Sequence, residues 1–178
     1  MPRLFTGLEI PAEIRLALSA YRGGLPGARW VEPENYHITL RFIGDIDDGL
    51  ARDVTAALSE AGPRPPITVT LDALDSFGGR SPRIIMARAL ASEALSALQA
   101  ENEQLLRRVG IPPEGKRFVP HVTLARLKGT SPAAVAHYIA MHGAFQKLSF
   151  SAQRFVLYSS RASSGGGPYI VEAAYPLG

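Results

Sequence analysis

Apolar and polar residues follow one another along this chain in patterns that predict both strands and helices. Runs that are apolar or alternate between apolar and polar residues predict strands at about residues 4–10, 36–43, 67–71, 83–89, 118–127, 146–159 and 169–175. Helical spacing and start signals predict helices at about 12–21, 47–61, 92–109 and 131–142. A glycine-rich loop at 161–168 joins the last two strands. The order of these elements predicts an α+β fold, because the strands are too short and irregularly placed for a doubly wound sheet.

Two predicted strands carry nearly the same short motif. His37-Ile38-Thr39-Leu40 is matched by His121-Val122-Thr123-Leu124, about half the chain length further on. Residues i and i+2 of a strand share one face, so each motif presents its His and Thr together and turns its apolar residues to the core. If the two halves pack about a pseudo-twofold axis, two imidazoles and two hydroxyls meet in one cleft.

This quartet of side chains suits in-line displacement at a phosphorus atom. One imidazole can take a proton from the attacking oxygen while the other gives one to the leaving oxygen, because histidine titrates near neutral pH. The threonine hydroxyls can donate to phosphate oxygens. A single His-x-Thr on a strand is more often structural, but a matched pair favours catalysis. His137 and His142 have no matching partner and are expected at the surface or at a helix end.

Composition narrows the class of protein. The chain has 178 residues, of which 46% are hydrophobic and 20% charged, and we expect a single bilobed domain over residues 1–178. It contains no cysteine, which excludes disulfides, thiolate catalysis and cysteine-bound metals. Arginine dominates its basic residues and the net charge is +3. Arginine suits bidentate contact with phosphate, so an anionic partner is compatible with this balance.

Several other classes of protein lack support in the sequence. No run approaches the roughly 18–20 apolar residues that span a bilayer, and the N-terminus has no signal-peptide pattern, so we expect a cytoplasmic monomer without membrane association. Glu34 is the one acidic residue near either motif, which makes a poor ligand set, so no metal or other cofactor is expected. A phosphate-binding Gly-x-x-x-x-Gly-Lys-Ser/Thr motif is also missing, which disfavours ATP-driven ligation.

The motifs and their flanks resemble the 2H phosphoesterase superfamily, and within it the RNA 2′,3′-cyclic phosphodiesterases, historically called 2′-5′ RNA ligases. The resemblance covers nearly the whole chain, and it is carried by Arg3-Leu4-Phe5, Trp30-Val31, residues 35–44, residues 118–126 and the closing segments at 157–160, 167–169 and 175–177. It implies two antiparallel β-sheets in a pseudo-twofold, bilobed arrangement with outer helices and a central cleft. It also implies metal-independent hydrolysis of 2′,3′-cyclic phosphate ends of RNA to 2′-phosphates.

The resemblance also implies roles for individual residues. His37 would be the proton donor to the leaving 3′-oxygen and His121 the proton acceptor from water, although the pseudo-symmetry makes these roles nearly interchangeable. Arg126 would bind phosphate, together with Thr39 and Thr123, and Phe42 would stack on the terminal base. Arg126 and Phe42 lie at odd offsets from their histidines, so regular strands would turn both away from the catalytic face. Arg126 needs a bulge or a strand end to reach the site, and Phe42 is equally compatible with the core.

Two other functions stay open at this point. The same two histidines could run a reversible, ATP-independent 2′-5′ joining of RNA, or the chain could be a non-catalytic module that binds RNA ends or nucleotides. Intact His and Thr at all four motif positions favour the enzyme over the binding module, because binding alone does not need two proton-transfer groups. A metal hydrolase would lose activity in EDTA and regain it with zinc.

Overall fold

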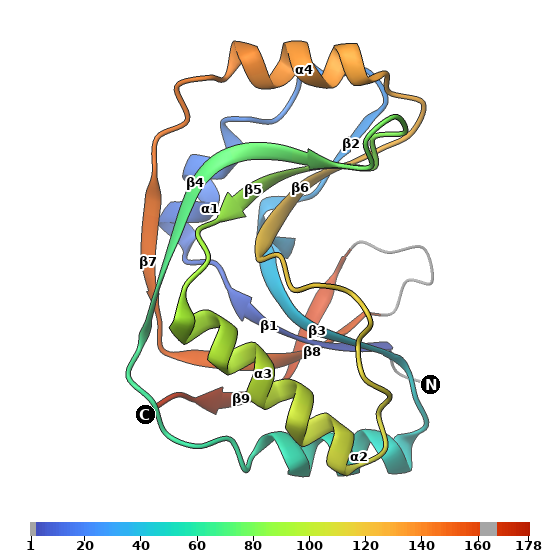
Figure 1. Ribbon diagram of the computed structural model, residues 1–178, viewed down its shortest axis with the longest axis vertical. Helices are drawn as coiled ribbons and strands as arrows, with labels where there is room; N and C mark the ends of the chain where they lie inside the picture. Colours follow the sequence, from blue (N-terminus) through green and yellow to red (C-terminus); the bar gives the residue numbers. More distant parts are fainter. Residues whose placement is uncertain (1–2, 161–166) are drawn as a thin grey trace.

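Strands occupy the centre of the molecule, with α4 at one end, α2 and α3 toward the other, and α1 beside the strands (Figure 1). The structure is a computed structural model that describes residues 3–160 and 167–178. The strands are β1 (Arg3–Glu9), β2 (Ala28–Trp30), β3 (His37–Asp45), β4 (Ile67–Phe77), β5 (Ile84–Ala89), β6 (His121–Leu127), β7 (Leu148–Ala152), β8 (Arg154–Ser160) and β9 (Tyr169–Pro176). The helices are α1 (Ala12–Ser19), α2 (Asp48–Leu58), α3 (Glu93–Arg108), α4 (Pro132–Met141) and the 3₁₀ turn η1 (Pro33–Asn35).

The strands form an antiparallel sheet with the two motif strands at its centre. In the described residues the sheet has nine strands in the order β7-β4-β5-β6-β3-β1-β8-β9, and β2 pairs with β6. Strands β3 and β6 join through Ile38 and Val122. The α+β class is confirmed. The two sheets expected from the sequence are joined at this pair, so they form one continuous sheet.

The sheet order reveals the pseudo-twofold relationship of the two halves of the chain. Outward from the centre, β6, β5, β4 and β7 correspond to β3, β1, β8 and β9. Strand β4 follows the first motif in the chain but lies in the half-sheet of β6, and β8 follows the second motif but lies in the half-sheet of β3. Each half therefore contributes a strand to the half-sheet of the other, which ties the two halves together.

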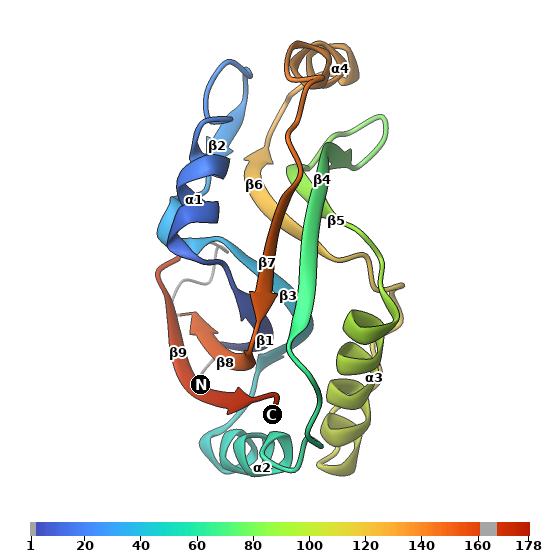
Figure 2. The same ribbon diagram turned by 90° about the vertical axis from the view of Figure 1, so that its left-hand side faces the viewer.

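The helices begin where the sequence predicted them, and α2, α3 and α4 cover the ends of the molecule. The side chains of Asp47, Ser92 and Ser131 each accept a hydrogen bond from the backbone N–H three residues on, which caps α2, α3 and α4. Figure 2 shows α2 and α3 packed side by side at one end, with α4 at the other. None of the helices in the described part of the chain is long and apolar enough to cross a membrane.

Some element boundaries differ from the prediction. The run predicted as a strand from residue 118 begins its strand only at His121, and the run at 146–159 is two strands, β7 and β8, separated at Gln153. Strand β2, which has only three residues, was not predicted. Residues 161–166 of the predicted loop lie outside the described residues.

Candidate active site

Each motif strand alternates as the sequence predicted. The apolar residues of both motifs, Ile38, Leu40, Val122 and Leu124, are at most 3% exposed. His37, Thr39, His121 and Thr123 are half-buried on the other face. Because the strands are antiparallel and meet at Ile38 and Val122, the two His-Thr pairs lie on either side of the pseudo-twofold axis.

A β-bulge in β3 changes the face that its later residues occupy. The pairing with β1 skips one residue between Thr39 and Arg41. Leu40 and Arg41 are consequently both buried, and the next residue, Phe42, is exposed on the face of His37. The odd offset of Phe42 therefore does not remove it from the catalytic face.

Strand β6 has a bulge at the corresponding place. Its pairing with β5 skips one residue between Thr123 and Ala125, so Leu124 and Ala125 are both buried. Arg126 then returns to the face that carries Thr123. Of the two ways that the sequence left open for Arg126 to reach the site, a bulge or a strand end, the structure has the bulge.

Both imidazoles are held by the same kind of hydrogen bond. His37 Nδ1 lies 2.9 Å from the carbonyl oxygen of Asn35, and His121 Nδ1 lies 2.7 Å from that of Val119. A carbonyl can only accept, so Nδ1 carries the proton in each neutral ring and Nε2 is the nitrogen that can exchange protons. His37 Nε2 is also 3.0 Å from the hydroxyl oxygen of Thr39.

A hollow of about 260 Å³ lies against the His37 side of this arrangement. Four of the residues predicted for the site line it, and four further residues complete its wall: His37, Thr39, Phe42 and Arg126, with Arg3, Phe5, Ser160 and Tyr169. Arg126 reaches it from β6, and its charge and that of His121 both act on His37. The hollow therefore collects groups from both halves of the chain.

Aromatic rings surround His37. The ring centres of Phe5 and Tyr169 are each 4.9 Å from that of His37, and the ring of Tyr158 is 5.6 Å away. Gly7 makes room for this cluster, because a Cβ there would lie 2.6 Å from the carbonyl oxygen of Ile38 and 3.2 Å from the ring of Tyr158. By contrast, His121 has an edge-on contact with Phe77, at 5.1 Å.

Burial shifts both histidines toward their neutral forms. It lowers the pKa of His37 to about 4; the hydrogen bond to Asn35 opposes this shift, and the positive charges of His121 and Arg126 add to it. Burial also lowers the pKa of His121, again opposed by its backbone hydrogen bond. Both imidazoles are thus neutral at pH 7 in the free protein.

Phe42 is placed at the rim of the hollow rather than in the core. Its side chain is 44% exposed, and the guanidinium of Arg3 lies 5.5 Å from the centre of its ring. An exposed ring with a cation against it presents a flat surface for stacking. The core interpretation of Phe42 that the sequence left open is therefore wrong.

The family relationships of the sequence agree with this geometry. The family described as LigT-like phosphoesterases matches residues 8–86 and 89–169. This chain belongs to the LigT-like phosphoesterase family. It is 30% identical over 164 residues to the RNA 2′,3′-cyclic phosphodiesterase of Bacillus subtilis strain 168, covering 88% of this chain and 87% of that protein. It is 29% identical to the protein of the same name from Geobacillus stearothermophilus, covering 97% of this chain but only 56% of that relative.

Solved structures have the same fold. A protein of Thermus thermophilus superposes with a TM-score of 0.81 at 26% identity, covering 98% of this chain and 97% of that one. E. coli LigT, solved in complex with 3′-AMP, gives a TM-score of 0.77 at 23% identity, with 99% of both chains covered. The fold that the sequence motifs implied is therefore confirmed for this LigT-like phosphoesterase.

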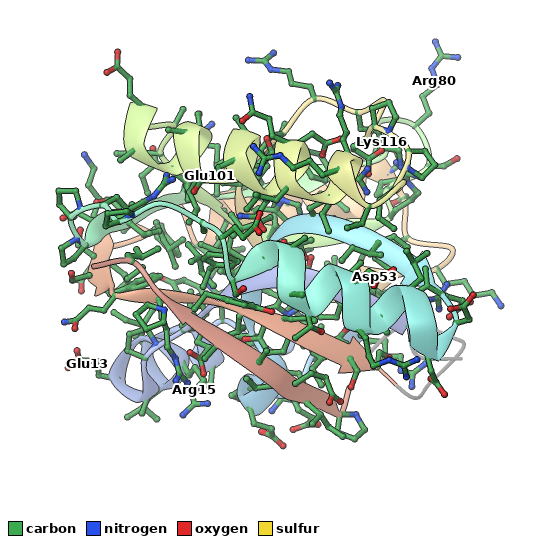
Figure 3. All side chains as sticks on the ribbon, turned by 90° about the horizontal axis from the view of Figure 1, so that it is seen from below. Glu13, Arg15, Asp53, Arg80, Glu101 and Lys116 are labelled. Carbon is green, nitrogen blue, oxygen red and sulfur yellow. The ribbon has the colours of Figure 1, made fainter. Side chains whose placement is uncertain are left out.

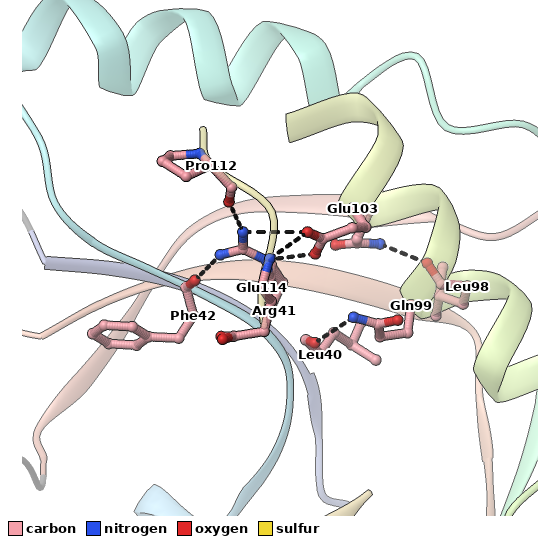
Figure 4. A network of polar contacts seen from close by, with 9 residues as sticks. Leu40, Arg41, Phe42, Leu98, Gln99, Glu103, Pro112 and Glu114 are labelled. Atoms are coloured by element: carbon pink, nitrogen blue, oxygen red, sulfur yellow. Dashed lines mark hydrogen bonds and ion pairs between the residues drawn. The ribbon is translucent and has the colours of Figure 1, made fainter. Parts of the chain in front are cut away.

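Arg41, to which the sequence assigned no role, is a structural anchor of this LigT-like phosphoesterase. It is 6% exposed and its Nε donates to Glu103 on α3 at 2.5 Å. Its other nitrogens donate to the carbonyl oxygens of Phe42 and Pro112 (Figure 4). Glu103 also accepts from the backbone N–H of Glu114 at 2.8 Å. The network fastens β3, at its bulge, to α3 and the segment that leads toward β6.

Sequence reasoning missed the aromatic wall and the carbonyls that orient the imidazoles. Tyr158 and Tyr169 stood in segments that carried the family resemblance, but nothing in their spacing indicated that they approach His37. Their place follows from β8 pairing with β1. His137 is exposed and His142 ends α4, as expected. Among the described residues, no three His, Asp or Glu side chains are grouped in a way that could hold a metal ion.

Proposed function

We propose that this LigT-like phosphoesterase hydrolyses the 2′,3′-cyclic phosphate ends of RNA to 2′-phosphates. The observation that carries the proposal is the matched pair of imidazoles, each with Nδ1 fixed by a backbone carbonyl and Nε2 available for proton transfer. The names of the relatives add support, because a Bacillus subtilis protein 30% identical to this chain is an RNA 2′,3′-cyclic phosphodiesterase.

The proposed reaction is a displacement by water at phosphorus. Nε2 of His121 accepts a proton from the attacking water as its oxygen bonds to phosphorus. The bond from phosphorus to the 3′-oxygen breaks, and Nε2 of His37 gives its proton to that oxygen. The products are a 3′-hydroxyl and a 2′-phosphate. The reaction as proposed uses no cofactor and no metal.

The acid role of His37 requires that substrate binding raise its pKa. Burial and the charge of Arg126 keep the pKa of free His37 near 4. A phosphate anion in the hollow offsets the charge of Arg126 and favours the protonated imidazole. We therefore expect bell-shaped pH profiles in which the bell for kcat, measured on bound substrate, lies at higher pH than the bell for kcat/KM.

The remaining residues predicted for the site divide between phosphate and base in this proposal. The hydroxyls of Thr39 and Thr123 and the guanidinium of Arg126 donate to phosphate oxygens, which carry more charge in the transition state. Phe42 stacks on the terminal base. Stacking contributes about 1–3 kcal/mol and depends little on which base is present, so we expect activity on RNA ends of any sequence.

Product analysis tests this function. The protein is incubated in EDTA with an oligoribonucleotide that ends in a 2′,3′-cyclic phosphate, and the product is compared with 2′-phosphate and 3′-phosphate standards. We expect the 2′-phosphate alone. A 3′-phosphate product, or turnover that appears only when zinc is added, would contradict the proposal. A parallel reaction with a 5′-hydroxyl RNA reveals 2′-5′ joining if the site also runs in that direction.

A further inference from the structure

Two arginines face each other directly beside the hollow. In the antiparallel pairing of β2 with β6, Arg29 is the register partner of Arg126. Register partners project from the same face of a sheet, and Arg126 lines the hollow, so Arg29 extends the basic surface outward from it. Both side chains are exposed. Like charges directly opposite each other destabilise a sheet. The presence of two arginines at these positions therefore is not explained by sheet stability.

Neither of these two positive charges is neutralised by a carboxylate in the described residues. Within residues 3–160 and 167–178, neither Arg29 nor Arg126 has an ion pair or a side-chain hydrogen bond. Lys128 adds a further exposed positive charge. Its backbone N–H donates to Gly27 at 3.1 Å, which continues the β2–β6 pairing by one residue and places Lys128 on the face of Arg126. This end of the sheet is a cationic surface open to an anion.

The opposite side of the hollow has a different charge pattern. Tyr169 separates the hollow from a second cavity of about 420 Å³, whose lining includes Arg15 on α1 (labelled in Figure 3) and Glu34. Arg154 and Glu9 also line this cavity, and two hydrogen bonds of 2.7 and 3.0 Å pair them with each other. A polyanion leaving the hollow in this direction would meet the carboxylates of Glu9 and Glu34 as well as two arginines, of which Arg154 is already paired, so this cavity carries no excess of positive charge.

We infer that Arg29 binds the phosphodiester that precedes the reacting end of an RNA strand, which leaves the hollow over β6 and β2. A guanidinium binds a phosphate with two parallel hydrogen bonds, and a phosphate on each arginine removes their mutual repulsion. The preferred substrate is then an oligoribonucleotide rather than a free cyclic mononucleotide. This inference rests on the proposed hydrolysis of cyclic phosphate ends.

The test compares two substrates and two arginine variants. One substrate is a nucleoside 2′,3′-cyclic phosphate, and the other is a short oligoribonucleotide that ends in the same cyclic nucleotide. Arg29→Gln removes the charge on the proposed strand path, and Arg15→Gln removes a charge in the second cavity as a matched control. We expect Arg29→Gln to lower kcat/KM for the oligonucleotide about tenfold, with a much smaller change for the mononucleotide, and Arg15→Gln to resemble the wild type. The slope of log kcat/KM against log salt for the oligonucleotide should become shallower by about 0.7, the value of one single-strand phosphate contact.

Each other outcome has a definite meaning. An unchanged oligonucleotide rate in Arg29→Gln overturns the inference, and so does an equal loss on both substrates, which would place Arg29 at the reacting phosphate. A selective oligonucleotide defect in Arg15→Gln instead would direct the strand through the second cavity. If the wild type hydrolyses neither substrate, the proposed function fails. Binding of a fluorescent oligonucleotide with an unreactive 3′-phosphate then decides the inference separately, since Arg29→Gln must weaken it and Arg15→Gln must not.

Discussion

The strands around His37 carry aromatic rings, whereas the strands around His121 carry charges. Both histidines use the same backbone hydrogen bond, both precede a threonine by two residues, and both strands bulge at the same point. After the bulge, β3 presents Phe42 and β6 presents Arg126. The symmetry is therefore kept where the two halves orient the imidazoles and lost in the residues that follow the bulges. The difference matches the proposed substrate, because a nucleotide is aromatic at one end and anionic at the other.

The two bulges also differ in what they bury. The β3 bulge buries Arg41, which reaches Glu103, and the β6 bulge buries Ala125. The His37 strand is thus held from behind by an ion pair, while the His121 strand is held by apolar packing and by β2, which pairs with it. Four experiments can break or sharpen this comparison.

The largest expected effect comes from the two histidines. His37→Ala and His121→Ala should each lower kcat by about 10²–10⁴-fold with the fold retained, because each removes one proton transfer. A cyclic substrate with sulfur in place of the 3′-oxygen separates their roles, since a thiolate leaves without a proton. It should restore turnover to His37→Ala and not to His121→Ala. Rescue of His121→Ala instead would show that His121 is the proton donor and His37 the acceptor. Near-wild-type rates of either variant on the normal substrate would refute the assignment of both histidines to proton transfer.

Breaking the anchor behind β3 should cost stability. Arg41→Ala removes the positive charge that pairs with Glu103 and leaves Glu103 with only the backbone N–H of Glu114, in a largely buried setting, so the free energy of unfolding should fall by about 3–5 kcal/mol. Urea denaturation followed by circular dichroism measures it. Arg108→Ala, which removes an ion pair exposed on both sides, is the control and should change little. Equally small effects of both variants would show that the Arg41 network does not hold the β3 bulge, and that the proposed difference between the two bulges is wrong.

The neutral state of His37 predicts a loss of stability in acid. Its pKa is 6.5 in an unfolded chain and about 4 in the folded one, so below pH 6.5 the unfolded chain takes up a proton that the folded chain refuses. The stability is fully present above pH 6.5 and declines as pH falls toward 4, by about 3 kcal/mol in total. Denaturation at several pH values should show a shallower decline for His37→Asn than for wild type. Identical slopes would mean that His37 is not held neutral.

The smallest effect should separate the two residues that follow the bulges. Phe42→Ala should weaken binding of an oligonucleotide by about 1–3 kcal/mol, because it removes the stacking surface. Arg126→Ala should weaken binding through the phosphate. An oligonucleotide that lacks its terminal base provides the contrast: Phe42→Ala should then have no further effect, and Arg126→Ala should keep its full effect. Anisotropy titration measures both. If both variants respond alike to loss of the base, the division between base and phosphate is wrong.

The sequence was sufficient for the fold class and for the face on which the motif residues lie. Ile38 and Val122 follow their histidines directly in the sequence, and side chains alternate between the two faces of a strand. Once Ile38 and Val122 are buried in the core, His37 and His121 must lie on the opposite face. The sequence also predicted that Arg126 needs either a bulge or a strand end to reach the site, because an odd offset contradicts a regular strand. The place of that bulge could not be read from the residues, since skipping Leu124 depends on how β5 pairs with β6.

Features that depend on distant parts of the chain were beyond the sequence. Arg41 could not be assigned because its partner Glu103 lies 62 residues away on a helix. Strand β2 has three residues and no alternation long enough to detect, so Arg29 had no visible connection to the site. The contact of Arg41 with Glu103 and the position of Arg29 beside the site depend on tertiary structure, which the local sequence pattern does not encode.

The exchange of strands between the two halves has a consequence during synthesis. The outer edge of β1, which begins at Arg3, is completed by β8, which ends at Ser160. Strand β1 thus keeps an open hydrogen-bonding edge until β8 has followed it out of the ribosome. Such edges recruit other strands, so the nascent chain is most exposed to mispairing between the emergence of β1 and that of β8. The aromatic wall around His37 is completed only when Tyr158 and Tyr169 have been synthesised.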